Sequence, residues 1–216
     1  RRPDAGTRET VRVRVLTGEA LRLPAPAAGR RVRAIGLLPD QIVTEALAVD
    51  PALRDGQVVA DPGRDLLKLA VVERHGKGGG IGLGLVRGLG LRAGALASSV
   101  AHDSHNLIAA GVEDRDLLAA LAAVRAAGGG LAVAAGGRAV ATLALPVAGL
   151  MSAEPAAAVA EGLARVTADA RELGALPAHP FMALSFLALP VIPALRLTDR
   201  GLVDVAGQRI VPLELP

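Results

Sequence analysis

The feature that most constrains the fold of this chain is the near absence of aromatic side chains. Its 216 residues include two Phe and no Trp or Tyr. Any hydrophobic core must therefore be built from Ala, Val, Leu and Ile. With 51% hydrophobic and 21% charged residues, the composition is typical of a folded soluble protein and argues against disorder. This length suits one domain with a sizeable core, or two small ones.

Short runs with strand character recur along the chain. Residues 11–15 alternate apolar and charged side chains, as in a half-buried strand, and residues 66–73 form a longer apolar run typical of a buried strand. Asp61 followed by Pro62 can cap a short helix between such runs. Further strands are predicted at 31–38, 81–86 and 95–100, a β-hairpin at 131–135 with 138–145, and a turn at 199–201 between the segments 195–197 and 202–205.

Two segments have the spacing of amphipathic helices. Residues 113–127 place leucines on one face, carry acidic residues in the first turn and end at Gly128. Residues 154–173 repeat apolar side chains every three or four positions, with Ser152 as a cap and Pro155 in the first turn. The type of the apolar segment 181–189 is left open.

The order of these elements predicts an α+β fold, in which a mixed β-sheet with flanking helices forms a single domain. We place this domain at residues 31–216. Residues 1–30 are interpreted as a connecting segment, whose strand belongs with a preceding domain, and residues 24–30 as its linker. The chain begins with Arg, so we expect a piece of a longer reading frame.

Charge and composition exclude several classes of protein. The net charge of +3 and pI near 10.4 suggest nucleic-acid binding, but the basic residues are dispersed and stacking platforms are missing. Without cysteine there are no disulfides and no thiolate ligands. The most apolar stretch, 181–195, is interrupted by prolines and too short for a bilayer, and no signal peptide is visible. We expect a cytoplasmic protein without nucleic-acid or membrane partners.

A glycine-dense region contains a weak dinucleotide-binding motif. Residues 88–93 match G-x-G-x-x-A, but that motif needs a helix directly after it to hold the pyrophosphate. The next residues, 95–100, have strand character instead. We therefore interpret the glycines as tight turns and close strand packing.

The densest polar cluster is Ser98 to Asn106, directly after an apolar strand. Polar, titratable side chains at a strand end commonly form a site. His102 and His105, spaced i and i+3, suggest metal binding with Asp103, but a catalytic metal needs more ligands and no H-x-H or H-E-x-x-H motif occurs. We predict no metal site here. The alternative is a polar turn in which Asp103 or Ser104 only caps backbone.

A second polar group, Glu73-Arg74-His75, closes the apolar strand 66–73. An acid, a base and a titratable ring at a strand end can line a pocket. A surface ion pair is the alternative, and the sequence does not separate the two.

The most distinctive block of the sequence is SSVAHDSHN at 98–106, within a longer block at 82–106. Further blocks lie at 35–47, 55–76, 145–152, 180–205 and 211–215. Together these blocks resemble the carboxyl-terminal domain of adenine deaminase, an amidohydrolase, and the resemblance covers nearly the whole chain.

The resemblance implies a hydrolase that converts adenine to hypoxanthine and ammonia in purine salvage. In such enzymes a barrel domain binds a pair of divalent metals, manganese or iron, and metal-bound hydroxide attacks C6 of adenine. The barrel ligands lie upstream of the matched blocks, so none maps onto this sequence. The expected partners are adenine and the barrel, with a homo-oligomer left open, and the chain alone is expected to be inactive.

The resemblance also gives the polar cluster roles toward adenine. His102, His105 and Asp103 are predicted to lie on the substrate side of the active site or behind it, and not to bind metal. Ser99, Ser104 and Asn106 are predicted to bind substrate. Two other functions remain open: a non-catalytic purine-binding module, and a structural or interaction module.

Overall fold

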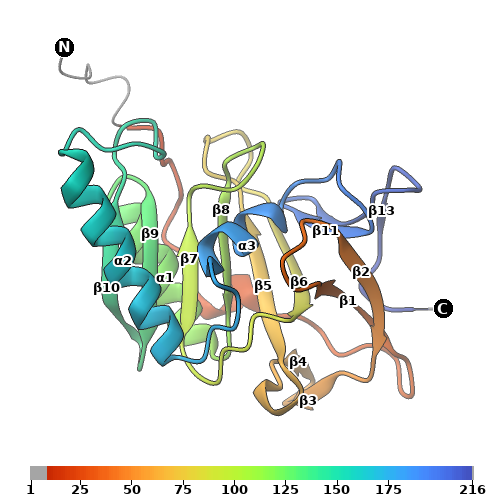
Figure 1. Ribbon diagram of the computed structural model, residues 1–216. Helices are drawn as coiled ribbons and strands as arrows, with labels where there is room; N and C mark the ends of the chain where they lie inside the picture. Colours follow the sequence, from red (N-terminus) through yellow and green to blue (C-terminus); the bar gives the residue numbers. More distant parts are fainter. Residues whose placement is uncertain (1–8, 216) are drawn as a thin grey trace.

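The computed structural model describes residues 9–215, and its centre is an eight-stranded mixed sheet (Figure 1). The strand order is β10-β9-β7-β8-β5-β6-β1-β2, in which β1 and β6 pair in parallel and all other neighbours are antiparallel. This confirms the predicted α+β fold with a mixed sheet in a single domain. The strands are β1 Val32–Leu37, β2 Thr44–Val49, β5 Leu66–Val72, β6 Ile81–Arg87, β7 Ala95–Ser98, β8 Leu107–Gly111, β9 Gly130–Ala135 and β10 Arg138–Ala144.

Helices cover both faces of this sheet. Helix α1 (Asp114–Ala126) packs behind β7, β8 and β9, while α2 (Ala156–Glu172) and α3 (Pro180–Phe186) lie on the opposite face (Figure 1). A three-stranded sheet of β11 (Leu195–Thr198), β12 (Gly201–Asp204) and β13 (Arg209–Val211) packs over β6. The remaining elements are β3 Ala52–Arg54, β4 Gln57–Val59 and the 3-10 turns η2 Gly18–Leu21 and η3 Pro62–Arg64.

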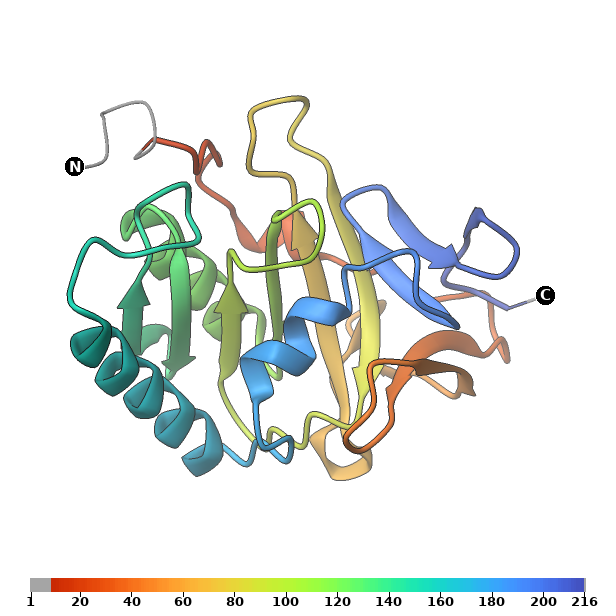
Figure 2. The same cartoon turned by 45° about the horizontal axis from the view of Figure 1, so that its top comes forward.

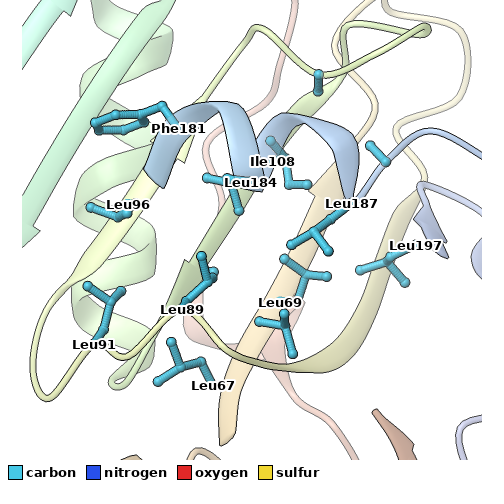
Figure 3. Packing of buried hydrophobic residues seen from close by; sticks show 14 of the residues in the cluster. Leu67, Leu69, Leu89, Leu91, Leu96, Ile108, Phe181, Leu184, Leu187 and Leu197 are labelled. Atoms are coloured by element: carbon cyan, nitrogen blue, oxygen red, sulfur yellow. The ribbon is translucent and has the colours of Figure 1, made fainter. Parts of the chain in front are cut away.

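Strand β5 is the centre of the core, because all seven of its residues are buried. Leu67, Leu69 and Val71 join the cluster under α3, whereas Ala70 and Val72 join the cluster under α1. Figure 3 shows Phe181, Leu184 and Leu187 packed above Leu69, Leu96 and Ile108. A fully buried Leu contributes on the order of 2 kcal/mol, so the aliphatic core predicted from the sequence can stabilise the domain.

The structure corrects the strand predicted at residues 11–15. No strand forms there, and a single hydrogen bond joins the Arg12 N–H to the Arg74 carbonyl at 2.7 Å. The alternation nevertheless has a physical cause, because Val11 and Val13 pack against the cluster under α1. Burial of one side of this segment accounts for the alternation of apolar and charged residues, but a β-strand also needs a series of backbone hydrogen bonds to a neighbouring strand.

Other elements differ at their ends. Helix α2 begins at Ala156, with Pro155 at its N-cap, and Ser152 accepts a hydrogen bond from Glu154 N–H in a turn before it. Ser152 therefore does not cap the helix as predicted. The apolar segment 181–189, whose type the sequence left open, is helical up to residue 186, within α3. Asp61 caps η3 as predicted.

The predicted connecting segment, residues 1–30, is described from residue 9 onward. Within it Leu21 and Leu23 are buried against the main sheet, and the Leu23 carbonyl accepts a hydrogen bond from Val58 N–H. The domain boundary at residue 30 stays a prediction. None of the helices in residues 9–215 combines the length and the apolar character needed to span a membrane.

Candidate functional site

Four connections meet at one edge of the domain (Figure 2). They are the β5–β6 connection (73–80), the β7–β8 connection, the β11–β12 turn (199–200) and the turn after β10 (145–151). We call residues 98–106 the polar loop. It contains every candidate site residue predicted from the sequence.

The start of the polar loop is anchored by two buried serines. Ser98 Oγ accepts a hydrogen bond from Val100 N–H at 2.9 Å. Ser99 Oγ accepts from Gly130 N–H at 2.7 Å and donates to the Gly149 carbonyl at 2.5 Å. Ser99 is fully buried, and its hydroxyl is engaged by the backbone, so it fixes the loop to β9 and to the turn after β10.

The end of the loop is held by the Glu73-Arg74-His75 segment. Arg74 Nε donates to the His105 carbonyl, and the ring nitrogen Nε2 of His75 lies 2.8 Å from the Ser104 carbonyl oxygen. The buried amide of Asn106 accepts from Arg74 N–H at 3.2 Å and donates to Asp199 Oδ1 at 3.1 Å. These contacts fix the loop through its backbone and Asn106, and they leave Asp103 and Ser104 exposed.

The sequence left two roles open for the Glu73-Arg74-His75 segment: lining a pocket, or forming a surface ion pair. Glu73 and Arg74 form no ion pair with each other. Burial alone would raise the pKa of Glu73, but hydrogen bonds from the backbone N–H groups of His75, Gly79 and Lys77 outweigh it and lower that pKa. Glu73 orders the β5–β6 connection, while Arg74 and His75 hold the polar loop.

The two histidines of the loop are adjacent. Their ring centroids are 5.5 Å apart in an edge-on arrangement, and His102 lies 5.1 Å from the ring of Phe186 on α3. His105 Nδ1 accepts a weak hydrogen bond from Ala101 N–H at 3.4 Å. In a neutral ring with Nδ1 as acceptor, Nε2 carries the proton and is available as a donor.

The surroundings of His105 favour the neutral ring. Its pKa lies below the ordinary value of 6.5, first because burial disfavours the charged form and then because His102 and Arg74 are close; Asp103 opposes the shift. A half-buried neutral imidazole can both donate and accept, as a proton-transferring group must.

A pH prediction follows from this shift. Because the folded state depresses the pKa of His105, its contribution to stability is complete above pH 6.5 and is lost as the pH falls below that value. We expect His105→Asn to flatten the fall in unfolding free energy between pH 7.5 and 5.5, measured by urea denaturation. Glu73, whose pKa is lowered from 4.5, affects only more acidic conditions. Parallel pH curves for the two proteins would contradict the prediction.

The described residues do not fit a metal centre. Within 9–215 no three His, Cys, Asp or Glu side chains gather closely enough to hold an ion. Both carboxylate oxygens of Glu73 are occupied by backbone N–H groups.

Fold and site together define an α+β domain that presents a firmly anchored polar loop at one edge of a mixed sheet. The profile of the adenine deaminase C-terminal domain matches residues 41–209, and the chain belongs to this family.

Three relatives illustrate the similarity, and each is an adenine deaminase by name. The protein of Desulfatibacillum aliphaticivorans is 56% identical, with 83% of this chain and 32% of the relative covered. That of Oleidesulfovibrio alaskensis is 52% identical, and the match covers 94% of this chain and 35% of the relative. Adenine deaminase 2 of Carboxydothermus hydrogenoformans is 46% identical, and the match covers 98% of this chain and 37% of the relative. The chain spans about a third of the length of these relatives.

Proposed function

We propose that this chain is the carboxyl-terminal part of a metal-dependent adenine deaminase, which converts adenine and water into hypoxanthine and ammonia. The observation that carries the proposal is about 50% identity over most of the chain to proteins named adenine deaminase. A barrel domain outside this sequence would hold the metal pair, manganese or iron. The setting would be purine salvage in the cytoplasm.

We further propose that the polar loop faces the active site of that barrel. Adenine presents ring nitrogens as acceptors and an amino group as donor. His102, Asp103, Ser104 and His105 can between them donate and accept to match. Ser99 and Asn106, whose polar atoms are bonded within the domain, would hold these four side chains in place.

Within this arrangement His105 is the best candidate for handling a proton. Its ring is neutral near pH 7, and Nε2–H is a free donor in the tautomer that accepts from Ala101 N–H. A neutral imidazole can accept a proton from water to become an imidazolium, and can then give a proton to the departing amine, which returns the ring to its neutral form. Asp103, which favours the charged ring, would stabilise the imidazolium that forms transiently.

Single replacements of His102 and His105 by Ala in the whole enzyme test the role of the loop. We expect kcat/KM for adenine to fall on the order of tenfold or more, as for loss of one positioned hydrogen bond or proton donor. Metal content should stay unchanged. His179→Ala is the matched control, because His179 is an exposed histidine outside the loop. Unchanged kinetics with a lower Tm would favour a loop that only caps backbone.

The alternatives, a non-catalytic purine-binding module and a structural or interaction module, predict different results. The purine-binding module should bind adenine as the 216-residue chain alone, measured by calorimetry. The structural module should bind no adenine, and loop replacements should lower only the Tm of the whole protein. We expect no ammonia release from the chain alone with added manganese or iron, and real turnover there would refute the need for a separate barrel.

A further inference from the structure

Arg74 contacts other segments of the domain in addition to the polar loop. Its Nη1 donates to Thr10 Oγ1 at 3.2 Å, and its Nη2 donates to the Ala148 carbonyl at 3.0 Å. Its Nε donates to the His105 carbonyl, and its own carbonyl accepts from Arg12 N–H. One residue thus connects the end of β5, the polar loop, the turn after β10 and the amino-terminal segment, residues 9–12.

The guanidinium of Arg74 is a buried charge with neutral partners. The residue is 2% exposed, and among residues 9–215 no carboxylate forms an ion pair with it. Burial lowers its pKa below the ordinary value of an arginine, but the side chain remains charged at neutral pH. A buried charge is costly unless its hydrogen bonds are satisfied. The planar fork of an arginine can reach three acceptors in different directions, which a lysine ammonium on a flexible stem cannot reproduce.

The turn after β10 leaves room for this side chain. A Cβ at Gly149 would lie 2.1 Å from Nη1 of Arg74, and Gly149 has a φ of +71°, which suits glycine. Any other residue at 149 would displace the guanidinium. The close fit explains why a small residue lies here, next to Ala148, which supplies the carbonyl acceptor.

We propose that Arg74 is a positioning residue that locks the polar loop to the amino-terminal segment and to the turn after β10. The proposal rests on the proposed function in one respect: the side chains held in this way are those that would face adenine. These contacts give the loop one backbone conformation, in which Asp103 and Ser104 are exposed and His102 lies beside Phe186. Arg74 also holds a positive charge beside His105, which further disfavours the imidazolium.

The first test replaces Arg74 by Lys and by Gln in the whole protein. Arg74→Lys keeps the charge but loses the fork, and Arg74→Gln loses both. In hydrogen-exchange mass spectrometry we expect peptides covering 101–106 to exchange at least tenfold faster in both variants. Arg33→Lys is the matched control, because Arg33 also joins segments through carbonyls, those of Pro212 and Glu214, and has no hydrogen bond to the loop. The control should leave exchange in 101–106 unchanged.

The second test measures how the charge of Arg74 affects the pKa of His105. We expect Arg74→Gln to raise the pKa of His105, measured by nuclear magnetic resonance titration of the ring, with a smaller rise in Arg74→Lys. In the whole enzyme the acid limb of the kcat/KM profile should move in the same direction. A residue that merely supports the fold would lower Tm without changing either titration.

The third test displaces Arg74 without replacing it. Gly149→Ala should accelerate exchange in 101–106 as the Arg74 variants do. Gly136→Ala is its control, because Gly136 also has a positive φ, of +62°, but its Cβ would meet no atom within 4 Å. The Gly136 variant should lose stability through backbone strain and keep loop exchange as in the unmodified protein.

The outcomes separate this inference from the proposed function. If Arg74→Lys and Gly149→Ala leave both loop exchange and the His105 titration unchanged, Arg74 does not position the loop, whatever happens to Tm. If these quantities change while His102→Ala and His105→Ala leave kcat/KM unchanged, Arg74 positions the loop but the loop does not serve adenine deamination. Changes in both sets support both proposals.

Discussion

Gly82→Ala is expected to lower the free energy of unfolding by about 3 kcal/mol or more, a large fraction of the stability of a typical domain. Gly82 lies in β6 beneath the β11–β12 hairpin, and a Cβ there would stand 1.8 Å from the Thr198 carbonyl oxygen. Because that oxygen is backbone, a rotamer change cannot relieve the clash. The hairpin must move off the main sheet, and the buried contacts of Leu197 and Leu202 are lost with it.

The matched control is Gly84→Ala, two positions along the same face of β6. Its Cβ would meet the Leu202 side chain at 3.3 Å, and a flexible side chain can shift. Alanine also loses less conformational entropy on folding than glycine does, which favours alanine inside a strand by roughly 0.5–1 kcal/mol. We expect a change within about 1 kcal/mol of either sign in urea denaturation. Equal losses for the two variants would contradict the close-approach argument.

Asp114→Ala is expected to have the second-largest effect, a loss of about 2–3 kcal/mol. Lys68 is 2% exposed, and its Nζ has two partners, Asp114 Oδ1 at 2.6 Å and the Leu21 carbonyl at 3.0 Å. Removing one partner leaves a buried ammonium in the centre of the sheet, which usually costs about 3–5 kcal/mol. The Asp114 side chain is 35% exposed, so solvent screens the pair and the smaller figure is expected.

Two variants separate this explanation from a general effect at the start of α1. Lys68→Met removes the charge together with its need for a partner and should cost only about 1 kcal/mol, because Asp114 can be hydrated. Glu113→Ala breaks the exposed Arg54 pair at 3.5 Å and should change stability by about 0.5 kcal/mol or less. The order of losses Asp114, Lys68, Glu113 in chemical denaturation is the expected result. A loss for Lys68→Met that equals or exceeds that for Asp114→Ala would overturn the interpretation.

The sequence by itself determined most of the elements and the position of the polar loop. Periodicity located α1, α2, β5, β6 and the predicted hairpin of β9 and β10, because side chains on one face of an element must share one environment. Composition excluded an aromatic core, and the structure has an aliphatic one. The block at 98–106 indicated the family that the comparisons show.

Only the tertiary structure decided which polar residues hold the candidate site and which are exposed on it. Thr10, Ala148 and Asp199 carry no local signal, yet each contacts Arg74 or Asn106 across a long separation in sequence. The pattern at 11–15 was wrong as a strand for the same reason. Periodicity reports which side chains are buried, but hydrogen-bond partners are set by how distant segments meet, and that requires the folded chain.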